Sequence, residues 1–185
     1  SALVDYTLYR HPESGDISSA EDIISYIKYQ RRAFNLFSNI KFALGFTPWK
    51  TRQLFNYIPN NLISKIFFLP LLARLFLKNT TILSWGSSLI CFKKLNNLSV
   101  VTVEDGFIRS VGLGSNLVSS SSFVFDKTGI YYDSSSPSDL ENLLSKTIIN
   151  DQQRIRADKL ISQITLNKVC KYNLKKTNFT ITIYS

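Results

Sequence analysis

Histidine and cysteine are scarce in this sequence. The 185-residue chain holds one histidine, His11, and two cysteines, Cys91 and Cys170, far apart along the chain. This excludes a histidine-rich metal site, a Ser-His-Asp triad centred away from His11, and a disulfide framework. We therefore expect no metal site, and the low cysteine content suits a reducing compartment.

Glycine, proline and long apolar runs are scarce as well. Seven glycines and five prolines are too few for a low-complexity chain, and 44% hydrophobic with 19% charged residues is ordinary globular usage. The most apolar run, 66–77, contains Pro70 and Arg74, and it is shorter than the roughly 20 residues of a membrane span. Asp5 and Glu13 interrupt the start of the chain, so we expect no secretory signal and a cytoplasmic protein.

Acidic residues are missing from most of the first half. None stands between Asp22 and Glu104, although that stretch carries many lysines and arginines, and a second basic run follows Asp151. The net charge of +9 attracts anions such as nucleic acid, anionic lipid, nucleotides or acidic sugars. A solvated basic face explains the composition equally well. The apolar and basic first half is also compatible with docking on a membrane surface.

Strand and helix patterns alternate along the chain. The expected strands are 42–46, 65–69, 81–85, 98–103, 123–125, 130–132 and 179–184. The expected helices are 19–37, 48–58, 70–77, 137–144 and 151–170. This alternation predicts an α/β fold, with a Rossmann-like parallel sheet flanked by helices. We divide the chain into an N-terminal extension and helix (1–40), a Rossmann-like lobe with an acidic motif (41–178), and the start of a missing second lobe (179–185).

Side chains mark two of the helix starts. Ser18 followed by Glu21 has the spacing of a capping box, in which Ser18 is the N-cap and Glu21 reaches back to it. Thr47-Pro48 places an N-cap residue before a proline at the first helical position. We therefore expect helices to begin directly after Ser18 and Thr47.

Two adjacent carboxylates, Glu104 and Asp105, stand at the carboxyl end of the expected strand 98–103, where open α/β sheets bind ligands. Adjacent strand residues face opposite ways, so one carboxylate can point into the crevice while the other braces the loop. Arg109 offers a planar fork for a carboxylate or phosphate, or it forms a salt bridge with Glu104. Asp105-Gly106 is also ordinary turn chemistry, so a capped turn and a catalytic site both remain open.

The loop after these carboxylates is rich in glycine. Glycine lets the backbone approach a ligand, and successive N–H groups can cradle an anion. At the end of strand 81–85, Trp85 either packs at the strand end or stacks on a base such as cytosine. The candidate substrate-binding residues are Gly106, Arg109, Ser110, Gly112, Gly114, Trp85 and Gly86. The glycines do not complete the dinucleotide-binding fingerprint.

Residues 104–115 resemble the hallmark motif of the capsule polysaccharide biosynthesis family of retaining β-Kdo transferases. Further stretches are similar in the same order, namely 45–50, 85–86, 126–133, 137–141 and 171–174. The resemblance runs from about residue 43 to the end and implies one lobe of a GT-B-like glycosyltransferase. The family's second lobe, with its Lys-Pro-His-Pro motif, has no counterpart in this sequence.

The resemblance implies transfer of the acidic sugar Kdo from CMP-Kdo, with retention, to a capsule or lipopolysaccharide O-antigen glycan. Asp105 would be the catalytic nucleophile and Glu104 a supporting residue. The implied partners are the sugar-nucleotide donor and a glycan or glycolipid acceptor, with no cofactor besides the donor and no nucleic acid. The implied location is the cytoplasm, with peripheral contact at the inner face of the inner membrane.

Two other functions remain open on the residues alone. One is a basic binding module without catalysis, which docks on nucleic acid or anionic lipid. It lacks support from any helix-turn-helix, zinc-finger or RNP motif, and binding of CMP or Kdo compared with DNA over a salt series distinguishes it. The other is a truncated, inactive relic of the enzyme.

Overall fold

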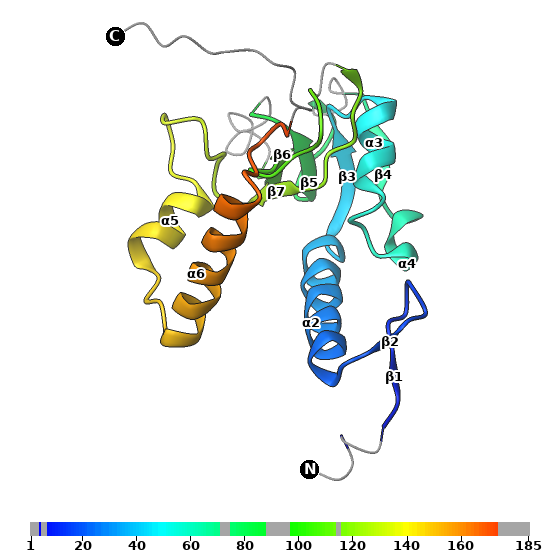
Figure 1. Cartoon of the computed structure of the whole chain (residues 1–185). Coiled ribbons are helices and arrows are strands. Elements are labelled where there is room, and N and C mark those ends of the chain that lie inside the picture. Colours follow the sequence, from blue (N-terminus) through cyan, green and yellow to red (C-terminus); the bar gives the residue numbers. More distant parts are fainter. Residues whose placement is uncertain (1–3, 5–6, 71–74, 88–96, 114–115, 174–185) are drawn as a thin grey trace, which may run out of the picture.

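The computed structural model describes residues 4, 7–70, 75–87, 97–113 and 116–173, and it contains a five-stranded sheet (Figure 1). The strand order is β4-β3-β5-β6-β7. The strands are β3 (Ile40–Leu44), β4 (Phe67–Leu69), β5 (Thr81–Trp85), β6 (Ser99–Asp105) and β7 (Phe123–Asp126). β4, β3, β5 and β6 run parallel, whereas β7 pairs with β6 in the antiparallel sense.

Helices and a small hairpin surround this sheet. The helices are α2 (Ala20–Phe37), α3 (Pro48–Leu54), α4 (Asn60–Ile63), α5 (Asp139–Lys146) and α6 (Asp151–Leu166). The hairpin consists of β1 (Tyr9–Arg10) and β2 (Ile17–Ser18). In the view of Figure 1, α3 and α4 lie at the opposite side of the molecule from α5 and α6.

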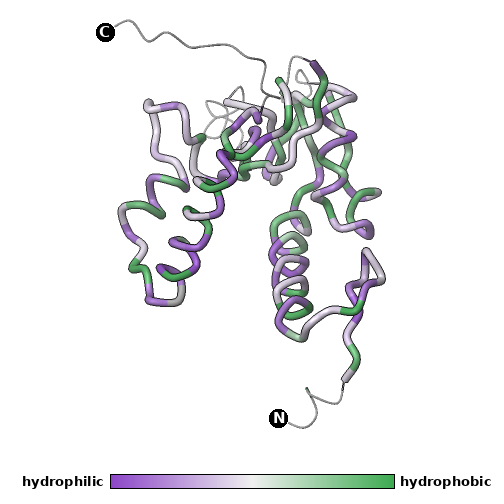
Figure 2. Tube along the Cα trace, in the orientation of Figure 1, coloured by the Kyte–Doolittle hydropathy of each residue, from purple (hydrophilic) through white to green (hydrophobic). Residues whose placement is uncertain are grey.

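The core lies on both faces of the central strands. Val101 and Val103 of β6 belong to a cluster that includes Leu54 of α3, whereas Val100 packs in a second cluster with Ile82. Figure 2 shows the strands as mainly apolar and the long helices as mixed. Burial on both faces is expected for a central parallel strand, and it fixes the carboxyl end of β6 in place.

The structure confirms the predicted fold class, a largely parallel α/β sheet flanked by helices, and it adds an antiparallel edge strand. Thr47 caps α3 as predicted. Ser18 does not cap α2, because it is paired in β2, and Ser19 accepts the hydrogen bond from the Asp22 N–H instead.

A predicted strand at 130–132 is wrong. This segment forms a turn, closed by a 3.1 Å hydrogen bond from the Asp133 N–H to the Ile130 carbonyl. Part of the predicted helix 70–77 and all of strand 179–184 lie outside the described residues. The division at residues 40 and 178 stays a prediction.

Candidate active site

Three parallel strands end at the same edge of the sheet and bring distant residues together there. β3, β5 and β6 end at Leu44, Trp85 and Asp105. The segment after β3 leads directly into α3, where the Thr47 hydroxyl accepts a hydrogen bond from the Lys50 N–H. This cap places Lys50 in the first turn of α3, next to the end of β6.

The Asp105 carboxylate is held by two cations. Its two oxygens lie 3.1 and 3.2 Å from Lys50 Nζ, and Oδ2 accepts a 2.8 Å hydrogen bond from Arg109 Nε. The Asp105 side chain is 15% exposed. Burial alone would raise the pKa of Asp105, but the hydrogen bonds and positive charges of Arg109 and Lys50 outweigh burial and lower it. Asp105 is therefore ionised at neutral pH.

Arg109 is the largest fully buried side chain of the described residues, at 1% exposure. Besides Asp105, it donates from one terminal nitrogen to the Ser110 hydroxyl at 2.8 Å. The alternative salt bridge from Arg109 to Glu104 is therefore wrong, because Arg109 pairs with Asp105. The contact of Arg109 with a substrate anion stays a prediction. In this structure the guanidinium is buried.

Lys50 belongs to the family-like stretch 45–50 but was not among the residues predicted for this site. Its Nζ lies 4.0 Å from the Trp85 ring centroid, a cation–π distance. The Trp85 ring also meets Phe46 and Phe123 edge-on, both at 5.7 Å between centroids. Trp85 thus packs at the strand end and supports Lys50. The Thr47-Pro48 cap was the available signal, since it fixes which residue occupies the first helical turn.

Glu104 takes a different environment from Asp105, as strand alternation predicts. Its Oε1 accepts a 3.0 Å hydrogen bond from the Asp105 N–H. Burial and then the charge of Glu104 raise the pKa of Tyr132. Gly86 lies beside both, because a Cβ there would be 3.6 Å from the Tyr132 hydroxyl and 4.0 Å from Glu104 Oε2. With a φ of +66°, Gly86 also occupies backbone space that favours glycine.

The loop glycines serve packing and turns in this structure. A Cβ on Gly106 would collide with the Ser122 side chain, and the Gly106 N–H donates to the Ser122 carbonyl at 2.8 Å. The space beside Gly106 is thus filled by Ser122. Gly112 has a φ of +109°. Ser110 is buried, and its hydroxyl donates to the Gly112 carbonyl at 2.7 Å.

Five of the predicted site residues form two neighbouring groups, which the hydrogen bond from the Asp105 N–H to Glu104 connects. Asp105, Arg109 and Ser110 are linked by side-chain hydrogen bonds, whereas Glu104 lies with Gly86. Gly114 lies outside the described residues. Within the described part of the chain, no three side chains of the metal-ligating kinds gather at one place, and no helix has both the length and the apolarity to cross a bilayer.

The family model for capsule polysaccharide biosynthesis proteins matches residues 88–184. The chain belongs to this family. Its matched stretch includes both carboxylates and the segment that follows β6. The match therefore covers Glu104, Asp105 and Arg109, whereas Lys50 and Trp85 precede it.

The curated relatives of this chain are longer proteins. The capsule polysaccharide modification protein LipA of Neisseria meningitidis is 34% identical over 187 residues, which is 97% of this chain and 26% of LipA. The lipopolysaccharide-processing protein LpsZ of Rhizobium meliloti is 45% identical over 74 residues, or 39% of this chain and 17% of LpsZ. The chain thus spans about a quarter or less of the length of these relatives.

Two solved structures of KpsC from Thermosulfurimonas dismutans share the fold. The β-Kdo 2,4 transferase superposes with a TM-score of 0.55 at 24% identity, covering 76% of this chain and 46% of that structure. The β-Kdo 2,7 transferase gives 0.50 at 26% identity, covering 74% and 45%. The predicted GT-B-like lobe architecture is therefore also the fold of these two transferase structures.

Proposed function

We propose that this chain provides the nucleophile-bearing lobe of a retaining β-Kdo transferase. The enzyme would move Kdo from CMP-Kdo to a capsule or lipopolysaccharide O-antigen glycan, or its glycolipid, at the cytoplasmic face of the membrane. The carrying observation is the ionised Asp105 carboxylate at the end of a rigid strand, between Lys50 and Arg109. The similarity to LipA and to the two KpsC transferases supports the substrate class.

The proposed reaction is a double displacement. An oxygen of Asp105 attacks the anomeric carbon of Kdo, and the bond from that carbon to the CMP phosphate oxygen breaks with its electron pair on the phosphate. The acceptor hydroxyl then attacks the same carbon, the ester bond to Asp105 breaks, and the hydroxyl proton passes to water or a basic group. Two inversions at one carbon give net retention.

The two cations around Asp105 suit both displacements. They keep the carboxylate ionised, which is the form that attacks, and they stabilise the charge that returns to it when the acceptor displaces the ester. Glu104 supports the site by accepting the Asp105 N–H, which fixes the backbone of the nucleophile.

The test is capture of the covalent intermediate in the full-length protein. Wild type and Asp105→Asn are incubated with CMP-Kdo, with and without acceptor, and analysed by mass spectrometry after proteolysis. We expect a Kdo adduct on Asp105 that acceptor removes, and a loss of transfer by several orders of magnitude in Asp105→Asn. Asp151→Asn is the matched control, because its side chain is 86% exposed. An adduct on another residue, or near-normal transfer by Asp105→Asn, would overturn the proposal.

A further inference from the structure

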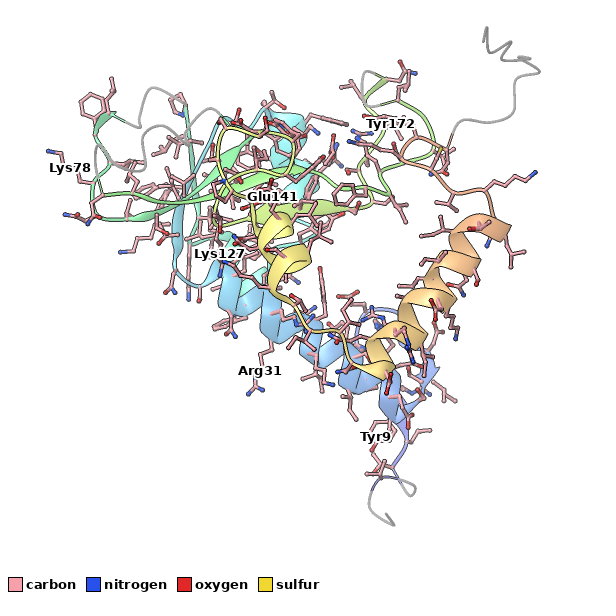
Figure 3. All side chains as sticks on the ribbon, turned by 90° about the vertical axis from the view of Figure 1, so that its left-hand side faces the viewer. Tyr9, Arg31, Lys78, Lys127, Glu141 and Tyr172 are labelled. Atoms are coloured by element: carbon pink, nitrogen blue, oxygen red, sulfur yellow. The ribbon has the colours of Figure 1, made fainter. Side chains whose placement is uncertain are left out.

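Residues 170–173, called the strap below, run alongside the loop that follows β6. Tyr172, which is labelled in Figure 3, forms a parallel bridge with Ser110. The N–H groups of Arg109 and Ser110 both donate to the Lys171 carbonyl, at 3.1 and 3.3 Å. The strap therefore fixes the backbone of Arg109 although it is remote in sequence.

The side chain of Asn173 holds the strap together and ties it to Ser110. Its Oδ1 accepts the Cys170 N–H at 2.8 Å, and its Nδ2 donates to the carbonyls of Cys170 at 2.8 Å and Ser110 at 3.2 Å. The backbone N–H of Asn173 also donates to the Ser110 carbonyl, at 2.8 Å. These contacts need an acceptor and two donors on one short side chain, which among the amino acids only asparagine provides at this length.

From Ser110, side-chain contacts lead to the carboxylate. The Ser110 hydroxyl accepts from Arg109, and Arg109 Nε donates to Asp105 at 2.8 Å. The guanidinium carbon of Arg109 also lies 5.9 Å from the Tyr172 ring centroid, within cation–π range. Backbone and side chain of Arg109 thus both depend on the strap.

We propose that Asn173 is a positioning residue for this site. It holds the Ser110 carbonyl, and through Ser110 it keeps the Arg109 guanidinium directed at Asp105. The inference rests on the proposed function for its catalytic consequence, but the positioning itself concerns only the described contacts. Asn173 does not touch the carboxylate, so its effect is exerted through Arg109.

The kinetic test compares Asn173→Ala and Asn173→Asp in the full-length protein. Asn173→Asp keeps the acceptor for the Cys170 N–H but loses both hydrogen bonds donated by Nδ2. This variant replaces Asn173→Ala in the test if the alanine variant does not fold. We expect kcat to fall on the order of 10-fold to 100-fold with KM little changed, because a misplaced Arg109 affects the reacting carboxylate more than donor binding. Asn167→Ala is the matched control, since its amide also donates to a backbone carbonyl, that of Gln163, but at the end of α6.

A second readout does not depend on transfer. In NMR spectra of protein labelled with ¹³C at the aspartate side-chain carboxyl, each resonance reports the titration of one aspartate. The resonance of Asp105 is identified as the one that is absent from Asp105→Asn. The groups that face or adjoin Asp105 are Lys50, Arg109, Tyr57, Tyr131 and Glu104. Weaker contact with Arg109 should move the titration of Asp105 to higher pH in both Asn173 variants and not in Asn167→Ala.

The two readouts separate the two proposals. If the wild type transfers no Kdo, the proposed function fails, and the titration still decides the role of Asn173. If the folded Asn173 variants titrate like the wild type, the positioning role is wrong even when transfer is reduced.

Discussion

Two aspartates end neighbouring strands of the sheet with different partners. Asp126, the last residue of β7, is 1% exposed and accepts hydrogen bonds from the backbone N–H groups of Thr128, Gly129 and Asp139, at 2.9, 2.7 and 3.1 Å. Asp105, the last residue of β6, accepts from the charged side chains of Lys50 and Arg109.

The difference in partners separates a structural aspartate from a chemical one. Asp126 ties the turn after β7 to the start of α5, and its partners are backbone N–H groups. Figure 3 labels Lys127 of that turn and Glu141 of α5. The Lys50 partner of Asp105 lies 55 residues away. A carboxylate at a strand end that is ion-paired by one cation from its own loop and one from a remote helix is the kind of group that active sites use. The predictions below test this distinction.

After Asp105→Asn, Lys50→Met should have the largest effect on transfer. It removes the charge beside Asp105 while keeping the apolar length that packs on Trp85. We expect transfer by the full-length enzyme to fall on the order of 100-fold, as when one electrostatic contact to a reacting group is lost. Lys50 helps to lower the pKa of Asp105. As the pH is lowered, Lys50→Met should therefore lose activity at a higher pH than the wild type does.

Lys65→Met provides the control for this experiment, because Lys65 is exposed and precedes β4. The measurements are initial transfer rates over a pH series for both variants and wild type. If the transfer rates of Lys50→Met and wild type fell at the same pH on acidification, Lys50 would not act on Asp105.

Asp126→Asn should act on stability and leave transfer intact. Asparagine replaces one carboxylate oxygen by an NH₂ group, which would face a backbone N–H and leave it unsatisfied. We expect a loss of about 1–3 kcal/mol in the free energy of unfolding, measured by urea denaturation, with unchanged transfer per folded molecule. Lost transfer at unchanged stability would place Asp126 in the chemistry and remove the distinction from Asp105.

Much of this site was predictable because β6 has a clear pattern. Val100, Val101 and Val103 make both faces of this strand apolar. A buried strand that leads to Glu104-Asp105 could therefore be predicted directly from the sequence. The partner of Asp105 could not be read in the same way. The Thr47-Pro48 cap places Lys50 in the first turn of α3, but only the sheet, in which β3 and β6 end at the same edge, brings that turn to Asp105.

Where the structure departs from the predictions, contacts with other parts of the chain are the cause. Residues 130–132 have the β-branched and aromatic composition of a strand, yet tertiary context makes them a turn, because β-propensity depends strongly on context. Two adjacent serines, Ser18 and Ser19, both offer a capping hydroxyl, and the pairing of β2 decides between them. The space assigned to a ligand beside Gly106 is occupied by Ser122, which arrives from a distant loop.

Gly106→Ala tests how tightly the loop after Asp105 is packed. The added Cβ would collide with the Ser122 side chain, so the loop must shift. Overpacking of this kind costs about 1–3 kcal/mol, and we expect a loss in this range by thermal unfolding. The double variant Gly106→Ala/Ser122→Gly should recover part of that loss. No recovery would mean that the Ser122 backbone, rather than its side chain, sets the limit.

The smallest expected effect is on the pH dependence of stability. The folded-state pKa of Asp105 is lowered, so this group contributes stability above its unfolded pKa of about 3.9, and the contribution is lost as pH falls through the lower folded value. Asp105→Asn removes that contribution, so its free energy of unfolding should decline less steeply than that of the wild type between neutral pH and acid. Urea denaturation at several pH values measures both slopes. Asp151→Asn, with its exposed side chain, should follow the wild type more closely. Parallel slopes for Asp105→Asn and wild type would show that the two cations do not favour the ionised carboxylate in the folded protein.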